Sequence, residues 1–405
     1  MIIHMISEHA SPLAVLGGAD AGGQNVHVAA LATALAGRGH EVTVFTRRDD
    51  AALPTRVPLR SGVVVEHVDA GPASPVPKDA LLPFMPEFAA ALERSWRMEA
   101  PDVAHAHFWM SGWAALTAAS DLGVPVVQTF HALGSVKRRH QGSADASPGE
   151  RRVLEPRVAR AAQRIVATCT DEVRELGTYG ARPDRVSVVP CGVDLRLFRP
   201  EGRIAPRTPR PRVLAVGRLV RRKGLDTVLE ALASLPEAEL LVVGGAPGAS
   251  PQDDPDLSER LAAAAGHGVA DRVAFLGGVA HEEVPALMRS ADVVVSVPWY
   301  EPFGMVPVET MACGRPMIAS AVGGHLDTIV DGVTGLLVPP RDPGALTAAL
   351  HQVLDRPRLR DAMGRAGAER ARSHYSWERV AAETENAYTR AAGRRPALAN
   401  REPKS

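Results

Sequence analysis

Short apolar runs alternate with segments of helical periodicity along most of the chain. In the first half, the apolar runs predict strands at Ile2–Ile6, Val42–Thr46, Val63–Val68, Val103–His107, Val124–Phe130, Arg164–Cys169 and Val186–Val189. The segments between them predict helices at Val26–Arg38, Pro86–Met98, Trp113–Leu122 and Asp171–Tyr179. Strands that alternate with helices indicate βαβ units and a mainly parallel sheet.

The same alternation begins again after a Pro- and Arg-rich stretch at 199–211, which lacks periodicity and is typical of a linker. Beyond it, strands are expected at Val213–Val216, Glu239–Val243, Val273–Leu276, Val293–Val297 and Met317–Ser320, and a turn with a short strand is expected at Gly332–Val338. Helices are expected at Leu225–Leu235, Leu257–Ala265, Glu282–Ser290 and Val306–Ala312, with further helices out to Ala391. The pattern predicts an α/β protein with two doubly wound domains, residues 1–198 and 212–375, and a cleft between facing sheet edges.

Length and charge narrow the class of protein. A chain of 405 residues exceeds what one hydrophobic core usually supports, in agreement with two domains. Lys plus Arg and Asp plus Glu both number 46, so no overall field attracts nucleic acid or a membrane. Three separated cysteines disfavour a disulfide framework or a zinc site, and no apolar run approaches the ~18 residues of a membrane span. Since the N-terminus resembles a strand and not a signal peptide, we expect a cytoplasmic protein.

Two carboxylates flank a tight turn in the second half of the chain. Glu301 and Glu309 are separated by a Pro-Phe-Gly turn at 302–304, directly after the strand expected at Val293–Val297. A strand that ends in a turn and leads into a helix brings backbone N–H groups and acidic side chains to the carboxyl edge of a sheet, where ligands bind. Pairs of Glu are common, so this pair becomes informative through its neighbours, which are Arg218, Lys223, Gly323 and Gly324.

Two glycine-bearing loops are candidates for phosphate binding. The loop Gly17–Asn25 fits neither G-x-G-x-x-G nor a P-loop, but its glycine pair opens a helix and can approach a phosphate closely. A flexible turn explains this loop equally well. The loop Gly217–Gly224 is basic and follows the first strand of the second domain. Arg residues in such a loop are expected as ordinary surface charge. Because only four residues of the chain are Lys, a functional role is favoured most for Lys223. The D-x-D sequence at 254–256 resembles a metal-binding motif, but its position before a helix predicts a capping role.

The histidines and a basic segment allow both structural and functional interpretations. His105 and His107 share one face of an expected strand. A metal site there is disfavoured because no nearby spacing completes a ligand set, and packing or pocket lining is preferred. His131 follows a strand at its carboxyl end, which favours a functional role. The basic loop Lys137–His140, with Arg151-Arg152 beyond it, is expected to be solvated surface, with an anionic acceptor or a lipid headgroup as the alternative.

Taken together, these motifs resemble glycosyltransferase family 4, whose members have the two-domain GT-B fold. The resemblance covers essentially the whole chain and rests on Gly22-Gly23, Gly217-Arg218, Lys223-Gly224, Glu301–Glu309 and Asp331–Val338. Segments 18–26 and 105–112 resemble the actinobacterial branch that transfers to D-inositol 3-phosphate, and sucrose-phosphate synthases are a more distant likeness. The resemblance also implies that a C-terminal helix, residues 376–393, packs on the N-terminal domain ahead of a disordered tail at 394–405.

The resemblance implies a retaining transfer from a nucleoside diphosphate sugar, with UDP favoured and with neither a metal nor another cofactor. Arg218 and Lys223 match the residues that offset charge on the departing diphosphate. His131 matches a histidine beside the donor sugar, and Glu301 matches the carboxylate on its hydroxyls. Glu309 matches the carboxylate that holds the ribose, so both carboxylates are binders and not an acid/base pair. The remaining donor-binding positions are Gly22, Gly23, Phe303, Gly304, Met305 and Val306.

The acceptor side departs from the inositol phosphate branch, which holds its acceptor with an Asn, a Lys, a Tyr, a Thr and an Arg. Asn25, Lys78 and Arg151 match three of these positions, whereas Phe108 and Ala132 replace the Tyr and the Thr. Each lost charge-assisted hydrogen bond costs about 1.5–3 kcal/mol. We therefore expect a different small polar acceptor, such as a cyclitol, an aminocyclitol or a sugar. Transfer to an inositol phosphate or to a lipid-linked acceptor is the alternative.

Proteins of other classes share this architecture. A nucleotide-sugar epimerase is disfavoured by the 301–309 motif together with Arg218 and Lys223, and a pyridoxal-phosphate phosphorylase by the lack of a convincing Schiff-base Lys. A non-catalytic sugar-binding protein would be expected to have lost Arg218, Lys223 or Glu309, and all three are present. The expected partners are a nucleotide sugar and a small acceptor, without nucleic acid, and the formation of a homodimer is left open.

Overall fold

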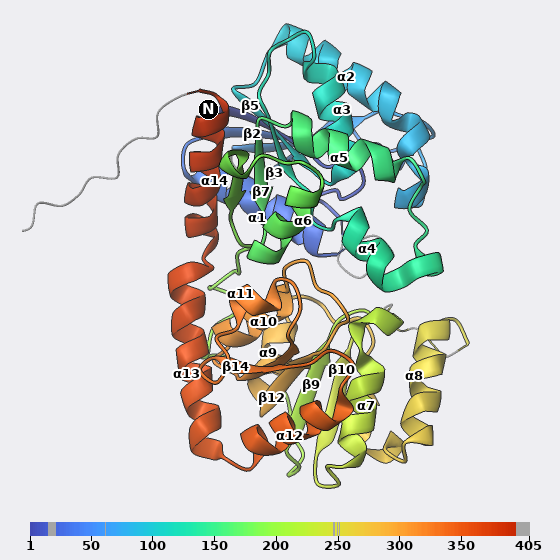
Figure 1. The fold of residues 1–405 in the computed structure, drawn as a ribbon, viewed down its shortest axis with the longest axis vertical. Coiled ribbons are helices and arrows are strands. Elements are labelled where there is room, and N and C mark those ends of the chain that lie inside the picture. Colours follow the sequence, from blue (N-terminus) through green and yellow to red (C-terminus); the bar gives the residue numbers. More distant parts are fainter. Residues whose placement is uncertain (15–21, 61, 246–247, 249, 251, 394–405) are drawn as a thin grey trace, which may run out of the picture.

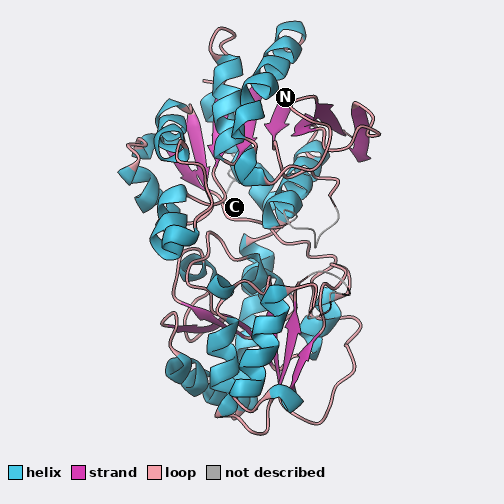
Figure 2. Ribbon diagram, turned by 90° about the vertical axis from the view of Figure 1, so that its right-hand side faces the viewer, coloured by secondary structure: helices cyan, strands magenta, loops and turns pink. Residues whose placement is uncertain are grey.

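The computed structural model describes residues 1–14, 22–60, 62–245, 248, 250 and 252–393, and it contains two β-sheets that are each covered by helices (Figure 1). Most of the loop Gly17–Asn25 and the tail expected to be disordered, 394–405, lie outside the described residues. No described helix combines the length and the apolar character that crossing a membrane requires. Figure 2 shows the two sheets one above the other, with helices on both sides of each.

The N-terminal sheet has the strand order β3-β4-β2-β1-β5-β6-β7-β8. Its strands are β1 (Ile2–Ile6), β2 (Glu41–Arg47), β3 (Arg56–Arg60), β4 (Val63–Val68), β5 (Val103–His107), β6 (Val126–Thr129), β7 (Arg164–Ala167) and β8 (Val186–Val188). All neighbours pair in parallel except β3, which is antiparallel to β4. The sequence prediction missed β3 because it is an edge strand in which no residue is fully buried, so no apolar run marks it.

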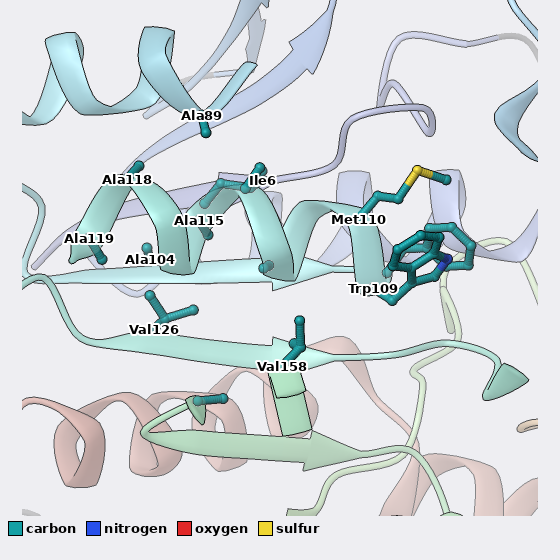
Figure 3. Packing of buried hydrophobic residues seen from close by; sticks show 14 of the residues in the cluster. Ile6, Ala89, Ala104, Trp109, Met110, Ala115, Ala118, Ala119, Val126 and Val158 are labelled. Carbon is teal, nitrogen blue, oxygen red and sulfur yellow. The ribbon is translucent and has the colours of Figure 1, made fainter. Parts of the chain in front are cut away.

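Two hydrophobic clusters cover the two faces of this sheet. One face packs against α2 (Met85–Met98), α3 (Trp109–Ala119) and α5 (Arg151–Ala161). The alanines of α3 let this helix approach the sheet closely, as Figure 3 shows for Ala115 and Ala119 on the side of the strand that carries Ala104. The other face packs against α1 (Gly23–Gly37) and α14 (Trp377–Ala391). The sheet is therefore doubly wound, as predicted.

Three expectations for this half were wrong in detail. The helix expected at Trp113–Leu122 begins earlier, at Trp109. The basic loop expected at Lys137–His140 is part of helix α4 (Gly134–Gln141), and α5 was not predicted at all. The buried face of α5 contains Arg151 and Glu155, which form an ion pair one helical turn apart, so a search for apolar periodicity overlooks it. Helix α6 (Thr170–Thr178) lies where it was expected.

The second sheet is entirely parallel, with the strand order β11-β10-β9-β12-β13-β14. Its strands are β9 (Arg212–Val216), β10 (Glu239–Val243), β11 (Val273–Phe275), β12 (Val293–Ser296), β13 (Met317–Ser320) and β14 (Gly335–Val338). The helices are α7 (Leu225–Ala233), α8 (Pro255–Gly266), α9 (Val284–Ser290), α10 (Met305–Ala312), α11 (His325–Thr328), α12 (Pro343–Leu354) and α13 (Pro357–His374). Hydrophobic clusters again fill both faces, so this half is also doubly wound.

The expected capping role of the D-x-D sequence is confirmed. Asp254 is the N-cap of α8, and its Oδ1 accepts a hydrogen bond from the Leu257 backbone N–H at 3.1 Å. Its carboxylate therefore satisfies one of the orphaned N–H groups at the start of the helix.

Polar contacts hold the connecting segment at 199–211 against the second half of the chain. Arg289 donates to the backbone oxygens of Arg199 (3.1 Å) and Arg203 (2.8 Å), and Arg207 lies 2.5 Å from the Asp292 carboxylate. The lack of periodicity that indicated a linker in the sequence therefore corresponds to a fixed, irregular backbone and not to a freely moving chain.

The C-terminal helices connect the two halves, as expected from the family resemblance. α13 packs on the second half, whereas α14 packs on α1, β6 and β7 of the first half (Figure 1). At the junction, the Val193 N–H donates to the Tyr375 oxygen at 2.8 Å, and Val193 forms a bridge with Ser376. Gly192 lies against the Trp377 ring, where an added Cβ would come within 2.5 Å of a ring carbon.

We predict that Gly192→Ala lowers the thermal unfolding temperature by several degrees. The new methyl group would displace the nearly buried Trp377, and overpacking of this kind costs about 1–3 kcal/mol. Gly177→Ala in α6 is the matched control, because a Cβ there meets nothing within 4 Å and Ala favours helix. Calorimetry that finds the same unfolding temperature for both variants would contradict this account of the junction.

Candidate functional site

The carboxyl ends of strands from both sheets meet at one cleft. The Glu301 turn follows β12, the Gly217 loop follows β9 and His131 follows β6. The first helix of the N-terminal half begins there as well, with Gly22 as the N-cap of α1. A Cβ added to Gly23 would lie 3.3 Å from Met305 Sδ, so the starts of α1 and α10 approach each other across the cleft. Two helix N-termini that meet in this way favour an anionic ligand.

Lys223 and Glu301 form an ion pair at the centre of the second-half site. Lys223 Nζ lies 2.5 Å from Glu301 Oε2. Burial by itself would raise the pKa of Glu301, but Lys223, His325 and Arg222 together hold that pKa below its ordinary value. Glu301 is therefore an ionised carboxylate with an ammonium partner at neutral pH, and it is a poor proton donor.

The turn that carries Glu301 depends on two close backbone approaches. A Cβ on Gly323 would lie 2.0 Å from the Glu301 carbonyl oxygen, and one on Gly324 would lie 2.1 Å from that of Phe303. The Gly324 N–H donates to the Glu301 oxygen at 3.0 Å. Only glycine fits at both positions, which explains why this pair accompanies the motif in the sequence.

His325 is part of the site and was missed by the sequence interpretation. Its ring lies against Gly304, the residue that precedes α10 with a φ of 88°. Nδ1 of His325 is 3.0 Å from the Ser320 oxygen, and Nε2 is buried without a hydrogen-bond partner in the described part of the chain. His325 is a lone histidine without helical or strand spacing to the Glu301–Glu309 motif, so only the fold reveals that its ring lies against Gly304.

Glu309 lies inside α10 and differs sharply from Glu301. Glu309 is only 8% exposed, and burial raises the pKa of its carboxyl to about 7. Among the described residues, no side-chain hydrogen bond or ion pair reaches this carboxylate. A desolvated carboxylate without a partner is well suited to accept hydrogen bonds from adjacent hydroxyls of a ligand.

Arg218 and Lys223 lie on the loop between β9 and α7. Arg218 is exposed, and Lys223 ends a 3₁₀ turn, Arg221–Lys223. Gly224 follows with a φ of 75°, and a Cβ there would lie 2.1 Å from the Val297 oxygen. This contact holds the loop against the end of β12, so the loop and the Glu301 turn are packed as one unit.

His131 has the left-handed backbone φ of 60°, which is uncommon for a residue with a side chain. Its Nε2 lies 2.9 Å from His107 Nδ1, and the His107 ring lies 4.1 Å from the His105 ring. His105 in turn contacts the Tyr388 hydroxyl (2.7 Å) and Thr129 Oγ1 (2.9 Å). Burial lowers the pKa of both His107 and His131 well below the ordinary value, so these rings are neutral at pH 7.

Sequence spacing disfavoured a metal site at His105 and His107, and of these two only His107 is grouped with other histidines in the structure. His27 of α1, His107 and His131 each offer one ring nitrogen, and these nitrogens lie within 4.8 Å of one another. His105 is not a member of this group and is bonded to Tyr388 and Thr129 instead. Sequence spacing could not reveal the cluster because its members come from a helix, a strand and a loop that are distant along the chain.

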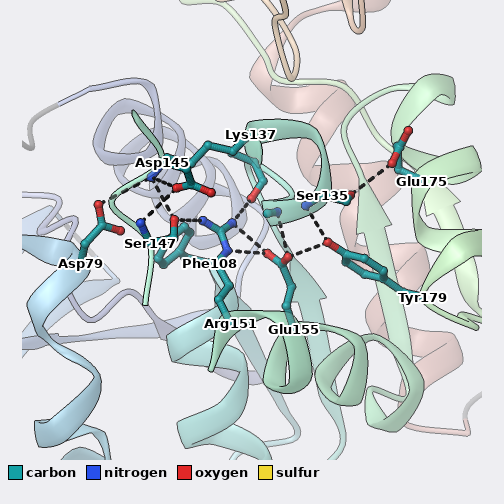
Figure 4. A network of polar contacts seen from close by, with 12 residues as sticks. Asp79, Phe108, Ser135, Lys137, Asp145, Ser147, Arg151, Glu155, Glu175 and Tyr179 are labelled. Atoms are coloured by element: carbon teal, nitrogen blue, oxygen red, sulfur yellow. Dashed lines mark hydrogen bonds and ion pairs between the residues drawn. The ribbon is translucent and has the colours of Figure 1, made fainter. Parts of the chain in front are cut away.

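Two of the residues expected at the acceptor position, Phe108 and Arg151, lie in a polar network around the cations Arg151 and Lys137 (Figure 4). Arg151 is 2% exposed, lies 2.8 Å from Glu155 and donates to the Ala132 oxygen at 2.6 Å. Its guanidinium also lies over the Phe108 ring, 5.1 Å from the centroid. Arg151 is thus a buried residue with its own carboxylate partner, and the expectation of a solvated surface is wrong for it.

Lys137 is the second cation of this network. Its Nζ lies 3.0 Å from Asp145 and 3.6 Å from Asp79. Lys78 precedes Asp79 in a short 3₁₀ turn, Lys78–Ala80, and is half-buried. Both cations that Figure 4 shows are therefore balanced by carboxylates of the chain itself.

Asn25 supports the start of α1. Its Oδ1 accepts from the Gly22 N–H at 2.9 Å, and its Nδ2 donates to the Ser11 oxygen at 3.0 Å. Asn25 therefore fixes the glycine pair that faces Met305, which is a structural use of its side chain at this position.

A cavity of about 240 Å³ joins the two halves of the site. Its walls include Glu301 and Tyr300 from the second half, and Ala132 and Glu172 from the first. The donor-side carboxylate and an expected acceptor position thus face one shared space.

Comparison with known proteins identifies similar chains over the full length. The family model "Glycosyltransferase Family 4" matches residues 21–197, and "Glycosyl transferases group 1" matches residues 201–370. The D-inositol 3-phosphate glycosyltransferase of Acidothermus cellulolyticus is 39% identical, covering 93% of this chain and 87% of the relative. That of Mycolicibacterium smegmatis is 38% identical, covering 96% and 91%.

Among solved structures, sucrose-phosphate synthase from Thermosynechococcus elongatus superposes with a TM-score of 0.87 at 33% identity, covering 96% of this chain and 98% of that one. The HepE protein of Anabaena, solved in complex with UDP, has a TM-score of 0.74 at 20% identity, covering 96% of this chain and all of that one. The second likeness concerns the fold alone.

The pKa of Glu309 generates a prediction about stability. Because its folded value of about 7 is above the ordinary 4.5, the native state binds more protons than the unfolded state between these values. Its contribution to stability is therefore fully present below pH 4.5 and is lost as the pH rises through 7. We predict that Glu309→Gln raises the free energy of unfolding at pH 8, by up to about 3 kcal/mol, and changes it little at pH 4.5.

Urea unfolding at both pH values measures this difference. The exposed linker substitution Glu201→Gln serves as the control and should show no such dependence. A Glu309→Gln protein that is less stable than the parent at pH 8 would show that the carboxylate has a stabilising partner after all.

Proposed function

The chain belongs to glycosyltransferase family 4, and from this premise we propose that it moves a hexosyl or N-acetylhexosaminyl group from a nucleoside diphosphate sugar to a hydroxyl of a small polar acceptor. We propose that the donor is a UDP-sugar, because a protein of the same fold has been solved with UDP. We further propose that the reaction retains the anomeric configuration and uses no metal. That the protein is a glycosyltransferase follows from its relatives, whereas these substrates and this mechanism are our proposal.

The Lys223–Glu301 ion pair is the observation that carries the proposal. Lys223 Nζ and Glu301 Oε2 lie 2.5 Å apart in a cleft where two helix N-termini meet, which supports a proposed diphosphate contact for the lysine and a sugar contact for the carboxylate. A bound donor would attract Lys223 towards its phosphates and leave Glu301 to accept from the sugar. On donor binding, the contact between Lys223 and Glu301 would thus be replaced by two contacts with the same ligand, one to its phosphates and one to its sugar.

In the proposed reaction, the acceptor oxygen attacks C1 of the donor sugar while the bond between C1 and the β-phosphate oxygen breaks. The acceptor proton passes to the departing phosphate oxygen, so the leaving group itself is the base. Arg218 and Lys223 offset the charge that develops on the diphosphate, the role that a bound metal ion has in other transferases.

The other residues of the site bind and orient the donor. Glu309, without a partner among the described residues, accepts from the ribose hydroxyls, and the backbone at 303–306 leads to it. His131 is neutral and half-buried beside the cavity, which suits a hydrogen bond with an uncharged sugar hydroxyl. Gly23 lets the diphosphate approach the start of α1.

The acceptor that we propose is uncharged or cationic and not a phosphate ester. The cations Arg151 and Lys137 are already paired with Glu155 and Asp145. Phe108 and Ala132 cannot donate the hydroxyl hydrogen bonds that a phosphate would require. A cyclitol, an aminocyclitol or a sugar fits this neutralised region better.

The relatives favour a second candidate. Two of them are named for transfer to D-inositol 3-phosphate and share more than a third of their residues with this chain. A phosphorylated inositol is therefore the acceptor that competes with ours, and it would have to displace Glu155 or Asp145 from the cations.

We predict that Lys223→Ala lowers kcat/KM for the donor by about 10²–10³-fold, because a preorganised charge on the leaving group is lost. Adding Arg218→Ala should lower it further. Arg221→Ala, in the same 3₁₀ turn and exposed, is the matched control and should stay within about threefold. Unchanged turnover per folded Lys223→Ala molecule, measured by UDP release, would reject the assignment.

We predict that acceptor-dependent UDP release is faster with neutral cyclitols or aminocyclitols than with inositol phosphate. The double substitution Phe108→Tyr with Ala132→Thr restores two hydroxyls and should shift the ratio of kcat/KM values towards the phosphate by about tenfold or more. A parent enzyme that prefers inositol phosphate would support the competing acceptor, and release with no acceptor at all would argue against transfer.

A further inference from the structure

Three buried histidines converge beneath the cleft from three separate elements. His27 lies on α1, His107 ends β5 and His131 follows β6. One ring nitrogen of each lies within 4.8 Å of the other two. His27 is 3% exposed and His107 is fully buried, whereas His131 is only partly buried. His131 directly precedes Ala132, which lines the cavity between the two halves, so the cluster lies next to that cavity.

The chain satisfies only some of the polar atoms of these three rings. His107 Nδ1 and His131 Nε2 share a hydrogen bond of 2.9 Å, whereas Nδ1 of His27 and Nε2 of His107 are buried and have no hydrogen-bond partner within the described residues. Buried polar atoms are normally paired, so these two nitrogens favour a ligand at the cluster. Burial also keeps the rings neutral, the form in which imidazole ligates a metal.

The spacing suits a metal ion after a small adjustment. When three atoms lie within 4.8 Å of one another, a central point is at most about 2.8 Å from each (4.8 Å divided by √3). Zinc–nitrogen bonds measure about 2.0–2.1 Å, so each nitrogen would need to move inwards by about 0.7 Å or less. The hydrogen bond between His107 and His131 shows that two of the rings already approach closely.

The surroundings hold the rings in place. The His105 ring contacts the His107 ring at a tilt of 40° and is fixed by Tyr388 and Thr129, whose oxygens lie 2.7 and 2.9 Å from its ring nitrogens. The Trp377 ring meets His27 edge to face, with the centroids 5.4 Å apart. Tyr388 and Trp377 both belong to α14, so this helix, which follows α13 of the second half, contacts the histidines through two of its side chains. Supporting contacts of this kind orient metal ligands.

We propose that His27, His107 and His131 bind a late first-row divalent ion of the Zn²⁺ class, and that the bound ion inhibits glycosyl transfer. Imidazole ligands suit zinc, copper and nickel rather than magnesium or calcium. Three protein ligands leave a fourth coordination position, which here faces the cleft. The ion would occupy His131 and prevent its contact with the donor sugar, so metal and donor compete. The inhibition rests on the proposed function, whereas metal binding does not.

Direct binding to the full-length protein tests the site. After EDTA treatment and its removal, titration with Co²⁺ should give visible absorption bands, and Zn²⁺ should displace them at one equivalent per chain. His27→Phe should weaken Zn²⁺ binding by about 100-fold or more, since losing a ligand costs at least as much as losing a supporting contact. His27→Gln is a second variant in case the first does not fold.

His4→Phe is the matched control, because His4 is also a buried histidine with an unpartnered Nδ1 but lies outside the cluster. It should leave the Zn²⁺ affinity unchanged. If the parent binds no Zn²⁺ at micromolar concentrations, or if His27→Phe and His4→Phe bind it equally, the site is hydrated and not metallated, and the proposal is overturned.

The inhibition is tested separately by UDP release. Zn²⁺ should inhibit the parent at the concentration at which it binds, EDTA should restore activity, and the donor should weaken the apparent affinity for Zn²⁺. Stoichiometric binding without competition by the donor would overturn the inhibition but leave the metal site. An enzyme inactive with every donor and acceptor would count against the proposed function, while the Co²⁺ and Zn²⁺ titrations would still decide the metal site.

Discussion

The ion pair between Lys223 and Glu301 is the interaction on which the site depends. It joins the loop after β9 to the turn after β12 at a distance of 2.5 Å, in surroundings whose burial alone would disfavour the charge of Glu301. Lys223 helps to hold the pKa of Glu301 below its ordinary value. The donor proposed here would replace both partners at once, by offering phosphates to the lysine and hydroxyls to the carboxylate.

Glycine contacts give this pair its geometry. Gly224 packs against the Val297 oxygen, and Gly323 packs against that of Glu301, so the loops that carry the two charges are held by backbone contacts. The histidines of the first half are supported differently, through side chains of α14. Because α14 continues from the second half, both sides of the cleft depend on one C-terminal segment. Domain closure around a ligand would therefore be transmitted to the histidines through this helix.

Much of the fold could be predicted because buried parallel strands leave continuous apolar runs, and β1, β4, β5, β10 and β13 begin and end where expected. β3 and α5 could not be predicted, since an edge strand with no buried residue and a helix whose buried face is an ion pair both lack that apolar signal.

In the site, the motif from Glu301 to Glu309 could be recognised in the sequence because both residues lie in one segment. His325 and His27 could not be recognised as neighbours of the site, because only the folded chain brings them to Gly304 and to His131.

We propose that Glu301 and Glu309 bind the donor and do not act as an acid/base pair. Glu301 is already paired with Lys223, and Glu309 lies within α10 without a partner among the described residues, an arrangement that suits acceptance of hydrogen bonds from ligand hydroxyls. The most direct measurement is the anomeric configuration, by proton NMR, of the product formed from an α-linked UDP-sugar. An α-linked product is what this account predicts. A β-linked product would require a base on the opposite face and would contradict it.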